Sequence, residues 1–158
     1  MRTKQAKTRT VEPDLKYNSL LVAKLINRSM VSGKKSVAQK HVYQALQQAA
    51  EKSGKKPLEV LEDAVANISP QMEVRSRRVG GASYQVPMPV RSRRAASLAI
   101  RWLVIEANKR SNSEHHTYAD KLAAELLAAL ENSGGAVEKK LTSHRMAEAN
   151  KAFSHFRW

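Results

Sequence analysis

Two segments of extended character that meet at Gly80-Gly81 constrain the fold more than any other feature of this sequence. A glycine pair between such segments is typical of the tight turn of a β-hairpin. Counting outward from this turn places Arg75 and Arg77 on one face of the hairpin and Arg78 on the other. Neither face is then cleanly apolar, and a bare hairpin is marginal in water. We therefore predict that residues 71–89 project from the body as an arm.

The same turn fixes the expected register of the hairpin. The predicted pairs are Val79 with Ala82, Arg78 with Ser83, Arg77 with Tyr84 and Arg75 with Val86. In this register Tyr84 could stack on a nucleic-acid base or pack along an arginine stem, and the sequence leaves both interpretations open.

Outside the hairpin, the apolar residues after residue 17 follow a helical period and predict six helices. The first begins near Ser19 and breaks at Ser32-Gly33, the second ends at Ser53-Gly54, and the third begins at Pro57 and ends before Pro70. The last three are expected at about 92–110, 119–130 and 137–150, with Gly134 as a C-terminal cap of the fifth. In the fourth helix the expected buried side consists of Leu98, Trp102 and Ile105, with Ala95 and Ala99 beside them.

These patterns predict a mainly α fold, a six-helix bundle with a protruding two-stranded β-hairpin between helices three and four. A chain of 158 residues is expected to form one domain. Residues 1–17 have almost no large apolar side chain and are expected to form a flexible basic arm. Residues 18–158 are expected to form the single helical domain, with the hairpin arm 71–89 included.

The charge of the chain points to a polyanionic partner. Lysine and arginine number 28 against 14 acidic residues, for a formal net charge of +14. The excess is concentrated, since residues 71–110 hold nine basic residues and two acidic ones. Arginine binds phosphate in bidentate geometry and stacks on bases, so this clustering indicates a nucleic-acid-binding surface more than an evenly charged soluble one.

Three arginines at the start of the fourth helix support this interpretation. Arg91, Arg93 and Arg94 lie where the helix dipole disfavours cations. A nearby phosphate would account for them and would itself gain from the helix N-terminus. Because arginines on an extended hairpin can reach several backbones of a folded strand, structured RNA is favoured over a DNA groove.

Other classes of function find less support in the sequence. The absence of cysteine removes disulfides, thiol catalysis and thiolate zinc sites. The histidines show no metal-ligand spacing, His41 is interpreted as a histidine at the edge of the core, and no acid–base set converges. We therefore expect no enzyme activity, no metal and no cofactor. No apolar run suits a membrane span or a secretory signal.

Two alternatives remain at this stage. An architectural DNA-binding protein could insert basic β-arms into a minor groove, although the acidic fifth helix argues against it. A nucleic-acid enzyme would need a set of convergent catalytic groups that the sequence does not display.

Several longer motifs resemble the family of small-ribosomal-subunit protein seven. The run from Val74 to Pro87 resembles the hairpin signature of that family. Further similar runs are Gly33 to Ala38, Arg101 to Leu103, Gly134 to Val137 and His144 to Phe153. The resemblance extends from about Pro13 to Trp158 and indicates a bacterial or organellar form.

The resemblance implies direct binding to the 3′ domain of small-subunit rRNA and nucleation of the assembly of the subunit head. It also implies a place near the exit-site tRNA and the messenger exit path, in a cytoplasmic or organellar ribosome. The lack of a long apolar run predicts no membrane partner. Together with the charge pattern it predicts rRNA binding by Arg2, Lys4, Lys7, Arg9, Lys34, Lys35, Arg75, Arg77, Arg78, Arg91, Arg93, Arg94, Arg101 and Arg110.

The resemblance also implies roles for the tip of the hairpin arm and for the C-terminal end of the chain. The expected tRNA-side tip consists of Gly80, Gly81, Ala82, Ser83 and Tyr84. Phe156 and Trp158 are expected to contact a neighbouring protein, with small-subunit protein eleven as the implied partner. The N-terminal arm departs from the family pattern, because its basic residues are separated by Thr, Gln and Ala where members often carry a tight arginine cluster.

Overall fold

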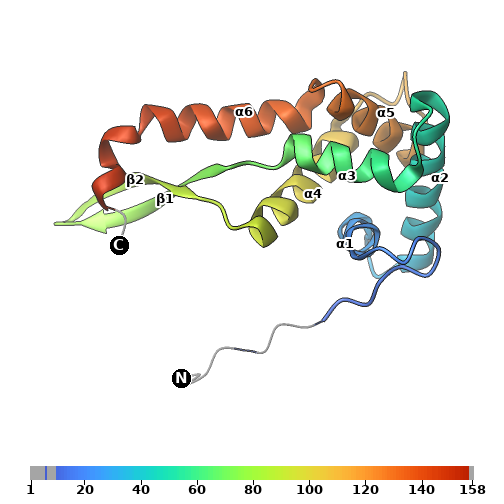
Figure 1. Cartoon of the computed structure of the whole chain (residues 1–158), viewed down its shortest axis with the longest axis horizontal. Coiled ribbons are helices and arrows are strands. Elements are labelled where there is room, and N and C mark those ends of the chain that lie inside the picture. Colours follow the sequence, from blue (N-terminus) through green and yellow to red (C-terminus); the bar gives the residue numbers. More distant parts are fainter. Residues whose placement is uncertain (1–5, 7–9, 157–158) are drawn as a thin grey trace.

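The computed structural model describes residue 6 and residues 10–156. Within them the chain forms six α-helices, a 3-10 helix and a two-stranded antiparallel sheet, which confirms the predicted fold class (Figure 1). The elements are α1 (Leu20–Ser29), α2 (Lys35–Ser53), α3 (Pro57–Ile68), β1 (Met72–Val79), β2 (Ala82–Pro89), α4 (Ser92–Lys109), α5 (Tyr118–Leu130), α6 (Gly134–Ala149) and η1 (Lys151–Phe156).

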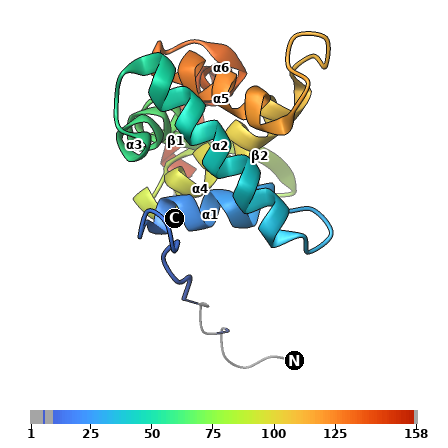
Figure 2. The ribbon, with the colours of Figure 1, turned by 90° about the vertical axis from the view of Figure 1, so that its right-hand side faces the viewer.

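The helical body is built around α2 and α5. Helix α2 packs on α1, α3 and α5, while α5 also packs on α4 and α6. In the end-on view of Figure 2, α2 crosses the front of the molecule with α1 below it and α5 and α6 above. The core is aliphatic, and its large, fully buried side chains include Leu25, Ile26, Leu46, Leu61, Ile68, Leu103, Leu122 and Leu126. This core fixes α1 and α4 relative to each other.

The helix ends follow signals in the sequence. The Ser19 hydroxyl accepts a hydrogen bond from the Leu21 N–H at the start of α1. Gly54 ends α2 in the left-handed conformation, with φ of 69°. Thr117 and Asp120 form a capping box at the start of α5, and hydrogen bonds from Thr117 and then Gln48 lower the pKa of the Asp120 carboxyl.

The hairpin has the predicted register, with Arg77 opposite Tyr84 and the turn at Gly80-Gly81. It protrudes from the body, but it is not bare, because α6 runs beside β1 and η1 turns back onto β2 (Figure 1). Val86 is fully buried. The Tyr84 ring lies 5.2 Å from the ring of Phe153. The expectation that neither face is buried was therefore wrong, since the C-terminal helices cover part of the hairpin.

The buried side of α4 also differs from the prediction. Its buried residues are Ala95, Ala99, Ile100, Leu103, Val104 and Ala107. The stripe expected to be buried lies to one side of this face, with Leu98 and Trp102 half-buried and Ile105 37% exposed. Ile100, Leu103 and Val104 repeat at equally regular helical intervals, so periodicity alone could not choose between the two faces.

The sequence suggested that Gly134 caps the end of α5, but in the structure Gly134 is the first residue of α6. Asn132, with φ of 55°, provides the left-handed residue after α5. A Cβ on Gly134 would lie 2.9 Å from the Cβ of Ala128, and one on Gly135 would lie 2.8 Å from Oε2 of Glu106. The two glycines thus allow the start of α6 to sit directly against α5 and α4.

The segment before α1 joins the body earlier than predicted. Asp14 is buried, and its carboxylate accepts hydrogen bonds from the Tyr43 hydroxyl at 2.6 Å and from the backbone N–H of Lys16 and Tyr17. The Lys16 ammonium lies 5.2 Å from the centre of the Tyr43 ring. Asp14 and Tyr17, which the predicted arm included, are therefore held against Tyr43 of α2.

Candidate nucleic-acid interface

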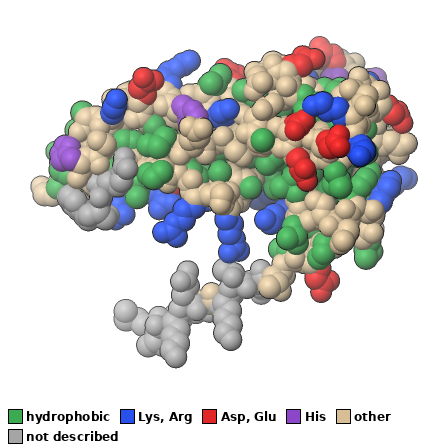
Figure 3. Space-filling view, in the orientation of Figure 1, with side chains coloured by type: hydrophobic (Ala, Val, Ile, Leu, Met, Phe, Trp, Pro, Cys, Tyr) green, Lys and Arg blue, Asp and Glu red, His purple; other side chains and the backbone are tan. Residues whose placement is uncertain are grey.

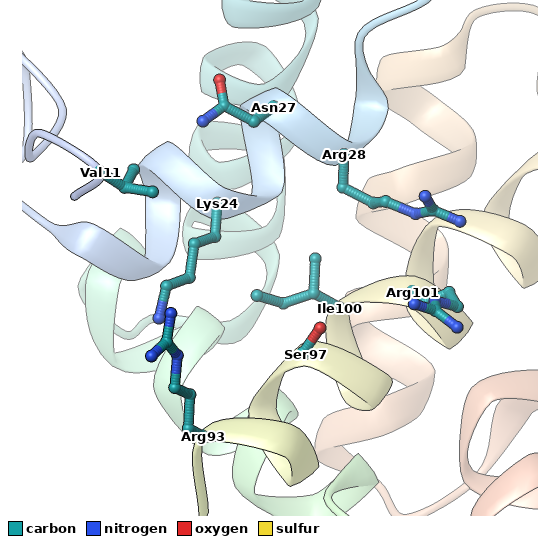
Figure 4. A pocket seen from close by; sticks show the side chains of 8 residues that line it. All are labelled: Val11, Lys24, Asn27, Arg28, Arg93, Ser97, Ile100 and Arg101. Carbon is teal, nitrogen blue, oxygen red and sulfur yellow. The ribbon is translucent and has the colours of Figure 1, made fainter. Parts of the chain in front are cut away.

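A hollow of about 370 Å³ between α1 and α4 forms the centre of the candidate interface (Figure 4). Lys24 and Arg28 line it from α1, while Arg93 and Arg101 line it from α4. We term it the α1–α4 groove. The remaining lining residues are Val11, Asn27, Ser97 and Ile100.

Helical spacing explains why these cations share one hollow. Lys24 and Arg28 are four residues apart on α1, and Arg93 and Arg101 are eight apart on α4 with Ser97 midway. Residues four apart lie on the same face of a helix. The opposite faces of α1 and α4 are anchored in the common core, so the two cationic faces are held opposite each other.

The groove is electrostatically unbalanced. None of its four cations forms an ion pair with another described residue, and no acidic side chain of the described chain lines the hollow. Like charges held close together repel one another, and a polyanion bound between them removes this cost. Asn27 and Ser97 add neutral groups that can hydrogen-bond to phosphate or ribose. The groove is thus suited to a nucleic-acid backbone.

The start of α4 extends this cationic surface toward the hairpin. Arg91, Arg93 and Arg94 are exposed there, and the first turn contains no acidic residue. Arg91 occupies the N-cap position without a side-chain cap, which leaves the helix end available to an anion. Arg91 and Arg93 are thus open to a phosphate, as the sequence-based interpretation requires, whereas Arg94 has an acidic partner in Glu73.

One acidic residue, Glu73, neutralises part of the arginine cluster at the base of the hairpin. Its carboxylate oxygens lie 2.6 Å from Nη2 of Arg75 and 2.6 Å from Nε of Arg94. Glu73 is only 7% exposed, and burial by itself would raise its pKa. Hydrogen bonds from Arg94 and Arg75, together with their charges, outweigh burial and lower the pKa of this carboxyl.

The remaining hairpin arginines and the tip are open to solvent to different degrees. Arg78 is exposed and Arg77 is half-buried, and neither forms an ion pair within the described residues. At the tip Gly80 and Gly81 have φ of 55° and 93°, with free space around both. Ala82 and Ser83 are exposed beside them, so a backbone or another molecule can approach the tip closely.

Tyr84 has a role that neither sequence interpretation included. Its ring packs between the hairpin and η1, 5.2 Å from Phe153 and 5.2 Å from Phe156. The Phe156 ring also lies 4.0 Å from that of His155. Both Tyr84 and Phe156, predicted as external contacts, therefore take part in an aromatic cluster that ties the C-terminal helix to the hairpin.

The other predicted binding residues fall into three groups. Lys34 and Lys35 are exposed at the turn between α1 and α2, where Ser32 and Gly33 have positive φ. Arg110 does not line the groove. Its guanidinium pairs with the buried Glu125 carboxylate at 2.8 Å, and the other oxygen of that carboxylate accepts a hydrogen bond from the Ala136 N–H at the start of α6. Arg2, Lys4, Lys7, Arg9 and Trp158 lie outside the described residues.

Sequence reasoning missed two members of the groove. Lys24 and Arg28 belong to an acid-free basic stretch, but the set of predicted binding residues contained neither of them. Their four-residue spacing was the available signal, and it became informative only once α4 was known to lie opposite.

The distribution of charge over the molecule agrees with this division. In Figure 3, Lys and Arg side chains line the lower edge of the molecule beneath the hairpin and α4, whereas acidic side chains gather over α3.

Across residue 6 and residues 10–156, no three His, Asp or Glu side chains come together as a metal site. Within the same part of the chain, no helix is both long and apolar enough to cross a membrane.

Comparison with known proteins decides the family. The model of the family described as ribosomal protein S7p/S5e matches residues 1–151. This chain belongs to that family. It is 55% identical to small ribosomal subunit protein uS7 of Sulfurihydrogenibium sp. (strain YO3AOP1), with 96% of each chain covered. It is 57% identical to the uS7 of Caldicellulosiruptor bescii, again over 96% of each chain, and 53% identical to that of Thermosipho melanesiensis over the whole of both.

Membership of the S7p/S5e family makes this chain a protein of the small ribosomal subunit that takes part in translation. The family consists of structural ribosomal proteins and not of enzymes, which confirms the expected absence of catalysis. The resemblance inferred from the hairpin signature is likewise confirmed. Its place in the cell is the ribosome.

Proposed function

We propose that this chain binds the 3′ domain of small-subunit rRNA directly and thereby nucleates assembly of the subunit head. The binding surface is the α1–α4 groove together with the arginines of the hairpin and of the start of α4 and the turn lysines Lys34 and Lys35. We term this the basic face. Arg110 is left out of it because it is paired with the buried Glu125 and its side chain is only 26% exposed, whereas Arg75 and Arg94 are paired but about half exposed.

The observation that carries the proposal is the set of four unpaired cations in the α1–α4 groove. Within the described chain, Lys24, Arg28, Arg93 and Arg101 have no acidic partner, although acidic residues elsewhere pair readily with arginine or lysine. A phosphate backbone supplies several anionic groups at regular spacing, and release of its counterions favours binding. Folded RNA suits this surface because the groove, the helix end and the hairpin present cations in different directions.

The hairpin tip and η1 are proposed to contact other components of the ribosome. We also propose that the tip, Gly80 to Ser83, lies near the exit-site tRNA and the messenger exit path, as the family resemblance implies; its glycines leave space for close approach. The aromatic cluster holds η1 against the hairpin, so a neighbouring protein that contacts η1, such as small-subunit protein eleven, would adjoin the same arm. A location in cytoplasmic ribosomes remains a prediction.

The decisive experiment compares the affinity of the chain for a 3′-domain rRNA fragment and for a random RNA duplex. We expect strong preference for the fragment and a steep salt dependence, with each phosphate contact contributing roughly 0.7–0.9 to the log–log slope. The variant Lys24→Ala/Arg28→Ala/Arg93→Ala/Arg101→Ala should lose most of this affinity while retaining its circular dichroism spectrum.

A charge-matched control separates the groove from net charge. The variant Lys52→Ala/Lys56→Ala/Lys109→Ala/Lys139→Ala removes the same number of positive charges from exposed positions outside the groove. It should bind the fragment nearly as well as the wild type. Equal loss in both variants, or equal affinity of the wild type for fragment and duplex, would reject the proposed binding surface.

A further inference from the structure

A second cavity, of about 280 Å³, opens beside the turn between α1 and α2. We term it the turn cavity. Its lining combines aliphatic side chains, two rings and several polar groups, contributed by Ser29, Val31, Lys34, Val37, Ala38, His41, Asn108 and Tyr118. None of these residues lines the α1–α4 groove, so the cavity is a separate feature of the surface.

The mouth of the turn cavity places exposed aliphatic groups next to cations. Val31 is 74% exposed and Val37 is 50% exposed, in a body whose other valines are mostly buried. Lys34 lines the same cavity, and Lys35 follows it at the start of α2. An apolar surface beside a cation suits a ligand that has a flat apolar part joined to an anion, as a nucleotide does.

His41 gives the cavity a hydrogen-bonding group that the protein itself leaves unused. Its Nδ1 is buried and has no hydrogen-bond partner among the described residues. The ring is held edge-on against Tyr118, with centroids 6.3 Å apart and an interplanar angle of 90°. That contact is not a hydrogen bond, so Nδ1 stays unpaired in a side chain that lines the cavity.

Tyr118 and Asn108 add further polar groups to the lining of the cavity. The Tyr118 hydroxyl already forms a 2.7 Å hydrogen bond with the Ser29 hydroxyl, and burial raises its pKa, so it remains neutral at physiological pH. Asn108 is exposed beside it and offers both a donor and an acceptor. An imidazole and a carboxamide can both form hydrogen bonds with the edge of an unstacked base.

We infer that the turn cavity binds one unstacked nucleobase of the RNA held by the basic face, with Lys34 at its phosphate. This inference rests on the proposed function. The cavity is near the lower limit of ligand pockets, which hold roughly 300–1,000 Å³, and so is suited to a single base more than to a larger group. The exposed Lys34 in its lining favours a nucleotide over an apolar side chain of a neighbouring protein.

Chemical probing of the bases of the 3′-domain fragment tests the inference directly. The wild type should protect the base edge of an unpaired nucleotide, and His41→Ala and Val37→Ser should each lose that protection. Affinity should fall on the order of tenfold, as expected for loss of one base contact. The hydroxyl-radical footprint on the backbone should persist. Leu141→Ser, at a 53% exposed leucine on α6, is the matched control and should change neither footprint.

A cross-linking experiment identifies the same nucleotide independently and does not depend on His41. Because the chain contains no cysteine, Val37→Cys carries a single thiol to which a photoreactive group can be attached. Val37 is half exposed, so the substitution should leave the fold intact. The cross-link should map to the nucleotide whose base is protected, and a Leu141→Cys control should not cross-link there.

The outcomes separate the two proposals. If the wild type gives no backbone footprint on the fragment, the proposed function fails and the inference fails with it. If the backbone footprint is present but His41→Ala and Val37→Ser retain every base protection, or no cross-link forms at the protected nucleotide, the inference alone is overturned. Either of these two results would favour a side chain of a neighbouring protein as the occupant of the cavity.

Discussion

The α1–α4 groove and the base of the hairpin are both rich in arginine, but their charges are in opposite states. In the groove Arg28, Arg93 and Arg101 have no acidic partner within the described chain. At the hairpin base Arg75 and Arg94 share the buried carboxylate of Glu73. The same residue type therefore serves as a site for an external anion in one region and as part of the folded structure in the other.

This difference shows that clustered arginine in a sequence does not measure the charge available to a ligand. At the hairpin base, one carboxylate holds two guanidinium groups, and each is still about half exposed. These arginines remain within reach of RNA, but their orientation is set before binding. In the groove the protein provides no such partner, so RNA binding itself must order the side chains.

The largest expected effect comes from reversing charge in the groove. Arg28→Glu/Arg101→Glu should weaken binding to the 3′-domain fragment by roughly a hundredfold or more, since each charged contact is worth about 1.5–3 kcal/mol and repulsion replaces it. The thermal midpoint should stay the same or rise, because mutual repulsion within the groove is relieved. Filter binding and thermal unfolding measure the two quantities. A large fall in stability would mean that these arginines act structurally, as those at the hairpin base do.

A smaller effect is expected at Glu73, where substitution should lower stability and leave RNA affinity nearly unchanged. Glu73→Gln should lower the free energy of unfolding by about 1.5–3 kcal/mol, because hydrogen bonds between charged groups are weakened at a buried position. RNA affinity should be equal or slightly higher, since Arg75 and Arg94 are released. Denaturant unfolding and filter binding provide the comparison. Strongly reduced affinity with unchanged stability would contradict the structural role assigned to this pair.

The pH dependence of stability sharpens the same contrast. The pKa of Glu73 is lowered in the folded state, so its contribution is complete above the pKa of the unfolded chain, near 4.5. That contribution is lost as the pH falls through the lower folded-state pKa. Glu73→Gln should therefore unfold with a flatter acid limb than the wild type in this range. Parallel acid limbs for the two proteins would show that Glu73 is not the group that titrates.

The smallest effect is expected from the aromatic cluster that covers the hairpin. Tyr84→Leu keeps an apolar side chain but removes the ring contacts with Phe153 and Phe156. Stability should fall by about 0.5–1.5 kcal/mol. Amide hydrogen exchange should accelerate in β2 and η1 but not in α2. Unchanged exchange in η1 would show that other contacts hold the C-terminal helix in place.

Much of the architecture could be predicted because its signals are local. Gly80-Gly81 fixed the register of the hairpin, and Gly54 and Pro57 marked helix ends through their own backbone preferences. The buried face of α4 was misplaced because Leu98 and Ile105 repeat as regularly as Leu103 and Ile100 do. Which of two regular stripes is buried depends on the helices packed against it, and that is not encoded locally.

The residues of the candidate site differ in the same way, since some were predictable from local sequence and others depend on how the helices pack. The arginines of the hairpin and of the start of α4 could be identified because they are close together in the sequence. Lys24 and Arg28 could not, because their partners in the groove lie on α4, about seventy residues away. The internal use of Arg110 was equally hidden, since Glu125 belongs to another helix.

The glycine contact at the start of α6 has a mechanical consequence. Gly134 and Gly135 fix one end of this helix on the body, and the other end supports the hairpin. A helix of 16 residues is about 24 Å long, so a tilt of about 5° at the glycines would displace its far end by about 2 Å. Helix α6 is in effect a lever arm, and small adjustments where it leaves α4 and α5 are magnified at the position of the hairpin.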